Sequence, residues 1–134
     1  MTLRQLIPML NVSSIRASLD FYRDALGFDV VSNPDAVDEW HWATIRSGDT
    51  ELMLAQTDGG PELAAGKDPH EEVHWPTIFY FYPSDVEQLY ASVVAAGFHP
   101  TPLKDTFYGM REFSLRDPDG HWLSFGQEHN DEEQ

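Results

Sequence analysis

The 134-residue chain has no cysteine, few basic residues and no long apolar run. Without cysteine it can form no disulfide, no thiolate nucleophile and no zinc–thiolate site. No apolar stretch approaches the roughly 20 residues that a membrane-spanning helix needs. The N-terminal residues also lack the apolar core of a secretory signal, so we expect a cytoplasmic protein.

Positive charge is scarce, because 8 basic residues stand against 23 acidic ones, for a formal net charge of −15. Such a surface repels phosphate backbones and anionic lipids, so neither nucleic acid nor membrane is an expected partner. The charge has two readings: it keeps a small protein in solution, or it attracts a cationic ligand. Part of it lies in an acidic tail, 129–134, which we expect to fray.

The first half of the chain has the pattern of a strand, a helix and three further strands. Ser13 or Ser14 is a suitable N-cap, and an apolar stripe from Ile15 to Leu26 at spacings of 4, 3 and 4 residues predicts a helix that ends at Gly27. Strands are predicted at 6–12, 28–31, 40–46 and 51–56, with a polar loop at 32–39.

The second half repeats this order. Strands are predicted at 76–82, 103–104, 110–116 and 121–127, and a helix runs from a cap at Ser84 or Asp85 to Gly97. The offset between halves is 71 residues from Ile7 to Ile78 and 70 residues from Gly27 to Gly97. A turn, Asp117-Pro118-Asp119-Gly120, joins the last two strands as a hairpin.

These patterns predict an α+β fold of two tandem βαβββ modules, at about 1–57 and 74–128, joined by a linker at 58–73. Each module has a sheet with a helix on its outer face, because one helix covers only one side of a sheet. We expect a cleft between the uncovered faces of the two curved mixed sheets, and we expect function to reside there.

Several segments carry a family resemblance. Ser18-Leu19-Asp20-Phe21-Tyr22 leads to Leu26-Gly27-Phe28, and Tyr108-Gly109-Met110-Arg111-Glu112-Phe113 leads to Asp117-Pro118-Asp119-Gly120. With the paired modules, they resemble the vicinal-oxygen-chelate superfamily. The opening Ile7-Pro8-Met9-Leu10-Asn11-Val12 and the segment Asp85-Val86-Glu87-Gln88-Leu89-Tyr90 are most similar to its glyoxalase and bleomycin-resistance branch. The resemblance spans roughly residues 5–128.

Enzymes of that superfamily hold a divalent cation with His, Glu or Gln from the first and last strands of each module. Carried over by resemblance, these positions are Ile7, Ile78, Ser124 and either Glu51 or Met53. Isoleucine cannot bind a cation, so we interpret the metal site as lost and expect neither cofactor nor catalytic residue. A displaced site from His41, His74 and Glu51 is an alternative.

Aromatic side chains and carboxylates remain as candidate ligand contacts. They suit a flat or cationic compound through stacking, cation–π attraction and charge pairing. Alternation places Trp40 and Trp42 on one strand face, and Tyr80 and Tyr82 on another. The candidate ligand-binding residues are Trp40, Trp42, Glu51, Tyr80, Tyr82, Phe107, Tyr108, Glu112 and Trp122. Packing in a core or dimer interface is the other reading of these aromatics. Arg111 is expected to be a buried arginine paired with carboxylates.

We therefore predict a metal-free small-molecule-binding protein that sequesters a cationic or aromatic compound in an acidic aromatic cleft. The resemblance implies a homodimer, because relatives build composite clefts. The alternative is a metal-dependent lyase, transferase or dioxygenase of the same superfamily with a displaced metal site. A third reading is a cleft protein for a metabolite unrelated to antibiotics.

Overall fold

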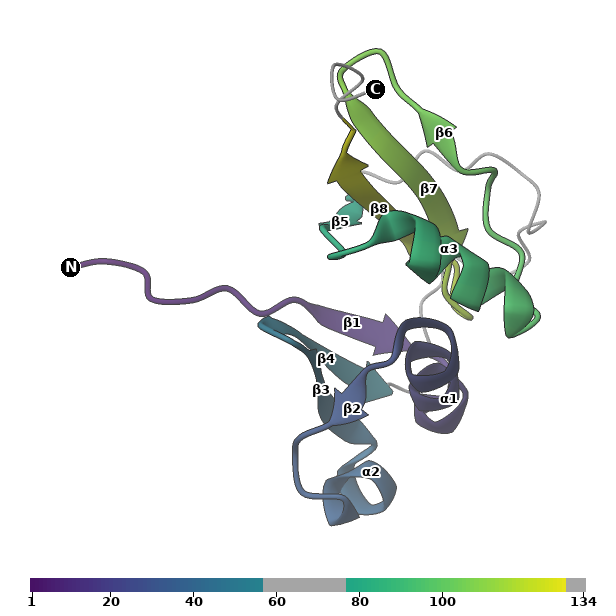
Figure 1. Cartoon of the computed structure of the whole chain (residues 1–134). Coiled ribbons are helices and arrows are strands. Elements are labelled where there is room, and N and C mark those ends of the chain that lie inside the picture. Colours follow the sequence, from purple (N-terminus) through teal and green to yellow (C-terminus); the bar gives the residue numbers. More distant parts are fainter. Residues whose placement is uncertain (57–76, 130–134) are drawn as a thin grey trace. The chain divides into compact units, whose positions relative to one another are not determined.

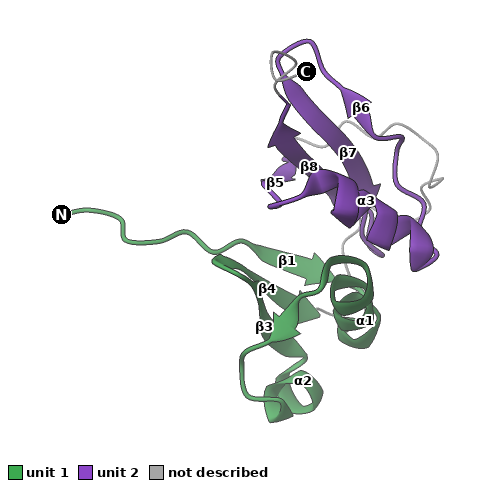
Figure 2. Cartoon of the chain, in the orientation of Figure 1, with its two compact units in different colours: residues 1–66 green, residues 67–134 purple. Residues whose placement is uncertain are grey.

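The computed structural model describes residues 1–56 and 77–129, and the chain divides into two compact units, Met1–Gly66 and Lys67–Gln134 (Figure 2). Each unit contains one four-stranded mixed sheet. The predicted linker at 58–73 and nearly all of the acidic tail lie outside the described residues. Within the described ranges, no helix combines the length and apolar character that a bilayer crossing requires.

Unit 1 folds as one βαβββ module with an added short helix (Figure 1). Its sheet has the order β1-β4-β3-β2, in which β1 runs parallel to β4 and the other neighbours are antiparallel. Its elements are β1 (Met9–Val12), α1 (Ile15–Leu26), β2 (Asp29–Val30), α2 (Asp35–Trp40), β3 (Trp42–Ser47) and β4 (Thr50–Gln56).

Unit 2 repeats this topology without the added helix. The order β5-β8-β7-β6 matches that of unit 1 strand for strand, again with one parallel pair, β5 and β8. Its elements are β5 (Phe79–Phe81), α3 (Val86–Ala95), β6 (Lys104–Asp105), β7 (Met110–Arg116) and β8 (Trp122–Glu128). The prediction of two tandem βαβββ modules is confirmed.

Both long helices begin in the same way. The Ser14 hydroxyl caps α1 by accepting from the Ala17 N–H, and the Asp85 carboxylate caps α3 by accepting from the Gln88 N–H. A second bond comes from the last strand of each module. Gln56 accepts from Ile15 N at 2.8 Å, and the Gln127 side chain accepts from Val86 N at 2.8 Å. Each closing strand therefore satisfies a backbone donor that a helix start leaves without an intrahelical partner.

Each of the two long helices, α1 and α3, packs on one face of its sheet. The opposite face of each sheet is called the helix-free face. In unit 1 the α1 side holds buried Leu10, Ala43 and Leu54. In unit 2 the α3 side holds Phe113 and Phe125, whose rings stack with centroids 5.0 Å apart. Phe81 stacks on Phe125, and Tyr90 meets Phe113 edge-on. Because side chains alternate along a strand, the residues between these lie on the helix-free faces.

Three sequence predictions are corrected by unit 1. The segment expected to be a polar loop contains α2, whose start is fixed by the Asn33 side chain accepting from Asp35 N at 3.0 Å. Trp40 is the last residue of α2, while Trp42 opens β3, and His41 between them has a left-handed φ of 54°. Trp40 and Trp42 therefore do not share a strand face. The first strand is also shorter than predicted, because pairing with β4 begins near Met9.

Candidate functional site

The helix-free face of the unit 2 sheet carries the polar and aromatic side chains of the candidate site. Strand register places Tyr80 beside Ser124, and Ser124 beside Ser114 on the next strand. One step along the same face, Glu112 on β7 lies opposite Gly126 on β8. Alternation therefore puts Tyr80, Glu112 and both serines on one side, away from the aromatic core beneath α3.

Tyr80, Glu112 and Tyr108 form one hydrogen-bonded cluster on this face. The Tyr80 hydroxyl donates to Oε2 of Glu112 at 2.8 Å, and the Tyr108 hydroxyl donates to Oε1 at 2.6 Å. The two phenols come from different elements of unit 2, since Tyr80 lies in β5 and Tyr108 in the turn between β6 and β7. Each oxygen of the carboxylate thus accepts a hydrogen bond from a neutral phenol.

Gly126 allows the Tyr80 ring to reach across the sheet. A Cβ at position 126 would lie 1.9 Å from the Tyr80 hydroxyl oxygen and 2.7 Å from the ring carbon that bears it. Any side chain there overlaps the phenol, because real Cβ atoms do not approach other heavy atoms so closely. Glycine in a strand interior often marks such a close approach. The Tyr80–Glu112 hydrogen bond therefore depends on Gly126.

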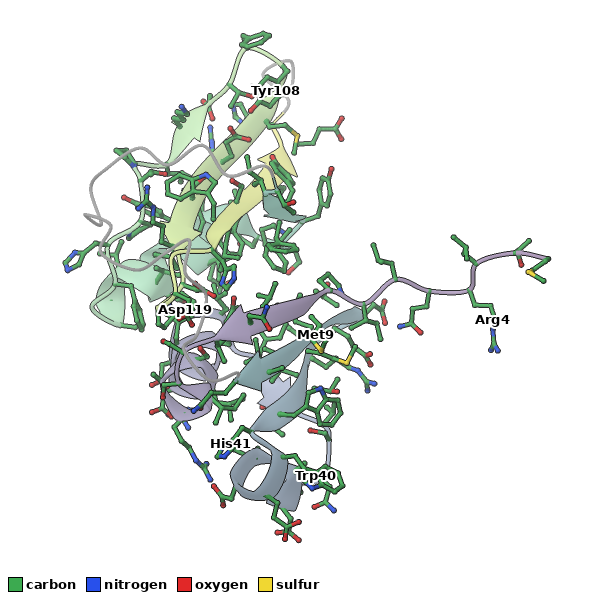
Figure 3. All side chains as sticks on the ribbon, turned by 180° about the vertical axis from the view of Figure 1, so that it is seen from behind. Arg4, Met9, Trp40, His41, Tyr108 and Asp119 are labelled. Carbon is green, nitrogen blue, oxygen red and sulfur yellow. The ribbon has the colours of Figure 1, made fainter. Side chains whose placement is uncertain are left out.

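Tyr108 is held by a tight turn between β6 and β7. Thr106 N donates to the Met110 carbonyl at 2.7 Å, and Met110 N donates back to the Thr106 hydroxyl at 3.0 Å. Gly109 has a φ of 86°, in the left-handed region that glycine adopts without steric cost. These bonds fix the backbone on both sides of Phe107 and Tyr108, so the Tyr108 ring projects from an ordered turn (Figure 3).

Two further aromatic rings flank the cluster. The Tyr82 ring lies 5.2 Å from the Tyr80 ring, and the Phe107 ring lies 5.0 Å from the Tyr108 ring, measured between centroids. Tyr82 is 78% exposed and Phe107 is 99% exposed. Large exposed apolar side chains that gather at one place are typical of binding surfaces, whereas single ones are ordinary. The structure thus brings five of the predicted ligand contacts together: Tyr80, Tyr82, Phe107, Tyr108 and Glu112.

The carboxylate changes the acidity of both phenols. Partial burial, followed by the hydrogen bond to Glu112, raises the pKa of Tyr80 above that of an ordinary phenol. The hydrogen bond to Glu112 is the largest cause that raises the pKa of Tyr108. Ionising either phenol would place a second negative charge beside Glu112. Both hydroxyls therefore keep their hydrogens at neutral pH, and neither is suited to act as a general base.

Trp122 lies on the same face, at the start of β8. Its partner in the register is Arg116, whose guanidinium carbon is 5.0 Å from the centroid of the Trp122 ring. Between this pair and the tyrosine cluster, the hydroxyls of Ser114 and Ser124 are 2.9 Å apart and hydrogen-bonded. Trp122 thus stacks with a cation of its own chain instead of joining the cluster around Glu112.

The remaining predicted contacts lie in unit 1. Trp42 is on the helix-free face of its sheet, where the register places it beside Ala55. Glu51 on the same face forms an ion pair with Arg46, the residue opposite it on β3. Trp40 is 72% exposed at the end of α2 (Figure 3). The structure therefore does not bring these three residues into one cluster.

The positions that the resemblance assigns to a metal do not fit a divalent cation. The register pairs Met53 with Met9 in unit 1 and Ser124 with Tyr80 in unit 2, both at an offset of 71 residues. Met53, not Glu51, is therefore the counterpart of Ser124. The donor set becomes two isoleucines, a thioether and a hydroxyl bonded to Ser114. These groups do not offer the imidazole or carboxylate ligands that such cations bind.

No alternative metal cluster occurs in the part of the chain that the structure describes, where no three His, Asp or Glu side chains gather closely enough to hold an ion. The displaced site predicted from His41, His74 and Glu51 is only partly described, because His74 lies outside the described ranges, as does His70. Glu51 is already bound by Arg46.

Arg111 has the carboxylate partners predicted for it but is less buried than expected. Its side chain is 26% exposed and forms ion pairs with Asp105 and Glu87. It lies on the opposite face of β7 from Glu112, as the alternation predicts. Its bonds join β6 to the first turn of α3, which is a structural role outside the candidate site.

Sequence reasoning missed two residues of this face, Gly126 and Arg116. Gly126 is in the interior of β8, and an isolated glycine in a strand is a signal of close backbone approach. Arg116 lies two positions beyond Ser114 in the alternation, so it shares the face of Glu112. That alternation was the available signal for Arg116.

Comparison with known proteins points to one family. The sequence model of the Glyoxalase/Bleomycin resistance protein/Dioxygenase superfamily matches residues 4–125. Bleomycin resistance proteins from Geobacillus stearothermophilus and from Staphylococcus aureus are each 28% identical over 132 residues, covering 92% of this chain and 96% of theirs.

Solved structures show the same fold. TioX from Micromonospora sp. ML1 superposes with a TM-score of 0.72 at 22% identity, covering 93% of this chain and 98% of its own. A bleomycin-binding protein from Streptomyces verticillus, in complex with copper(II)-bleomycin, gives a TM-score of 0.65 at 23% identity and covers 93% of this chain and 96% of its own. At these identities the superpositions establish the fold.

Proposed function

The chain belongs to the glyoxalase/bleomycin resistance protein/dioxygenase superfamily, and from this membership we propose that it is a metal-free binding protein that sequesters a cationic or aromatic small molecule. The observation that carries the proposal is the Tyr80–Glu112–Tyr108 cluster with its exposed neighbouring rings. A carboxylate surrounded by aromatic rings attracts a cation by charge and by the negative faces of the rings.

The net charge of −15 supports a cationic ligand, because a strongly negative surface raises the local concentration of cations. The comparisons support a binding role: the curated relatives are named bleomycin resistance proteins, and one solved neighbour of the same fold holds a drug complex. Binding without chemistry is supported by the side chains at the metal positions, since isoleucine and methionine replace the expected ligands at three of four.

A thermal-shift screen tests the proposal. Purified protein is heated with aromatic, cationic and anionic compounds, each with and without Zn²⁺, Mn²⁺ or Ni²⁺. A ligand that binds only the folded state raises the melting temperature by mass action. We expect cationic aromatic compounds to raise it and added metal to make no difference. Metal-dependent shifts, or about one tightly held metal ion per chain by elemental analysis, would instead support an enzyme with a displaced metal site.

Variants then locate the site. Tyr108→Ala removes an exposed ring and one donor to Glu112, so it is expected to weaken ligand binding more than folding. Val94→Ala removes another exposed apolar side chain of unit 2, on α3 and outside the cluster. This control is expected to bind as the wild type does. Equal losses of affinity and stability in Tyr108→Ala would show that Tyr108 serves packing instead.

We also propose that the protein is a homodimer. The support is the position of β1 and β5 at the edges of their sheets, where unpaired backbone groups favour cover by another chain. Light scattering at micromolar concentration tests this state, and a monomeric mass would count against it.

A further inference from the structure

The hydrogen-bonding directions in the Tyr80–Glu112–Tyr108 cluster restrict what a ligand can offer. A tyrosine hydroxyl has one hydrogen to donate. In both phenols that hydrogen is engaged with Glu112, at 2.8 Å from Tyr80 and 2.6 Å from Tyr108. The ionised carboxylate has no hydrogen at all. Toward a ligand, the three side chains therefore present acceptor lone pairs only.

The hydroxyls of Thr106, Ser114 and Ser124 do not change this property, because each is engaged within the chain. The Thr106 hydroxyl donates to the Met110 carbonyl at 3.0 Å, and the hydroxyls of Ser114 and Ser124 bond to each other at 2.9 Å. Arg116 shares the face, but its guanidinium lies over Trp122 and four residues along β7 from Glu112. At about 3.3 Å per residue of strand, the backbone positions of Arg116 and Glu112 are roughly 13 Å apart.

The acceptor-only character selects among ligand charges and shapes. A ligand carboxylate or phosphate would meet lone pairs and a negative charge, so anions are rejected. A quaternary ammonium would gain attraction from the rings but would leave every acceptor without a hydrogen. A planar cation with several N–H groups is attracted by the rings and also supplies hydrogens to the acceptors. Each carboxylate oxygen still has a lone pair that can accept, and two parallel N–H groups match the spacing of the two carboxylate oxygens.

We propose that the charged group of the ligand is an amidinium or guanidinium carried on an aromatic body, bound through its N–H groups to Glu112 and the two phenol oxygens. This inference rests on the proposed function and narrows its ligand class. The exposed rings of Tyr82 and Phe107 lie beside the two phenols and offer stacking surfaces for the flat body of the ligand.

Isothermal titration with four small probes tests the inference: benzamidine, benzyltrimethylammonium, benzamide and benzoate. All four carry one benzene ring. They differ in having a cation with N–H donors, a cation without donors, neutral donors, and an anion. We expect benzamidine to bind at least about tenfold more tightly than benzyltrimethylammonium, since a hydrogen bond to a charged group contributes on the order of one or two decades in affinity. Benzamide should bind more weakly still, and benzoate not at all.

Variants tie the preference to the cluster. Glu112→Gln removes the charge and introduces an N–H₂ donor, so it is expected to reduce benzamidine affinity about tenfold or more and to shrink the preference over benzyltrimethylammonium. Asp20→Asn makes the same charge change on α1 in unit 1 and is expected to leave both affinities unchanged. Should Glu112→Gln fail to fold, Tyr80→Phe and Tyr108→Phe each remove one acceptor and are expected to reduce the preference.

The outcomes separate the inference from the proposed function. Binding of benzyltrimethylammonium as tight as that of benzamidine would overturn the inference and leave a cation-binding site in place. Binding of benzoate above both cations would also overturn it. Binding of none of the four probes, together with no thermal shift from any cationic or aromatic compound, would overturn the inference and the proposed function together.

Discussion

The helix-free faces of the two sheets occupy equivalent positions in their units but differ in chemistry. In unit 1 the register pairs Met9 with Met53, and Trp42 with Ala55. In unit 2 the same places pair Tyr80 with Ser124, and Glu112 with Gly126. A thioether and an indole in one unit thus correspond to a phenol and a carboxylate in the other.

The comparison separates what holds each module together from what it presents. The cap at Ser14 or Asp85 and the strand-end glutamine at Gln56 or Gln127 occur in both units with the same bonds. The helix-free faces share almost nothing except an arginine on the third strand, Arg46 or Arg116. In unit 1 that arginine binds Glu51, whereas in unit 2 it lies over Trp122. The capping and glutamine bonds are repeated in both units, whereas the residues on the helix-free faces differ.

The largest expected effect on stability comes from replacing Gly126, the residue that makes room for Tyr80 on the helix-free face of unit 2. Gly126→Ala places a Cβ against the Tyr80 phenol and is expected to lower the free energy of unfolding by about 1–3 kcal/mol, as overpacking does. It also displaces Tyr80 from Glu112, so the raised pKa of Tyr80 is lost. Chemical denaturation measures the first effect, and tyrosinate absorbance in an alkaline titration measures the second.

The matched control is Ala55→Gly at the corresponding position of unit 1. It is expected to cost roughly 0.5–1 kcal/mol, from backbone freedom alone, and to leave the titration of the tyrosines unchanged. If Tyr80 keeps its raised pKa in Gly126→Ala, the close approach of its ring to Gly126 does not position that phenol.

The second largest effect on stability is expected at the strand-end glutamines that both units share. Gln56→Ala and Gln127→Ala each leave the first N–H of a helix without its side-chain acceptor, so each is expected to destabilise by about 1 kcal/mol. Gln127→Ala is expected to cost somewhat more, because its amide also donates to the Ser84 carbonyl at 2.9 Å. Urea denaturation measures both, with Gln88→Ala on the exposed side of α3 as a neutral control. A large loss of stability in only one of the two variants would show that the glutamine bonds are not equivalent in the two units.

A smaller effect appears at alkaline pH. The raised pKa of Tyr80 means that the folded state favours the protonated phenol. Below the ordinary phenol pKa of about 10 this preference is fully present, and above it stability falls, because the unfolded chain ionises first. Tyr80→Phe is therefore expected to lose less stability than the wild type between about pH 10 and 11. Tyr90→Phe, a phenol outside the cluster, provides the comparison, and an identical decline in all three proteins would contradict this account.

The smallest effect is expected at the ion pair of unit 1. Glu51→Gln removes one partner of a pair in which Arg46 is half exposed, so a change within about 0.5 kcal/mol is expected. Ligand affinity is expected to stay the same, because the Glu51 carboxylate is already paired with Arg46. A tenfold loss of affinity for a cationic ligand would show that Glu51 contacts the ligand.

Local signals made most of the fold predictable. Ser14, Gly27 and the apolar stripe between them define α1 within a few residues, and the turn at Asp117–Gly120 defines the β7–β8 hairpin. The helix α2 was missed because six residues with only Ala36 and Val37 buried are too few to show a helical period. That omission also produced the wrong strand for Trp40.

The site was predictable in its residue types but not in its bonds. Alternation and composition identified Tyr80, Tyr108 and Glu112 as candidates, and the structure brings them together. Tyr80 and Glu112 are 32 residues apart, so no local pattern reveals that they meet. Their contact depends on the order β5-β8-β7 and on the absence of a side chain at Gly126, which alternation alone does not specify.

The strand-end glutamines have a consequence for how such a chain can arise. Gln56 returns to the start of α1 and Gln127 to the start of α3, so in each half the final strand is tied to the helix that follows its own first strand. In both halves this bond joins two elements of the same half. A duplicated half-length chain therefore keeps the bond in each copy, and the helix-free face, which takes no part in it, is open to substitutions such as Tyr80 and Glu112.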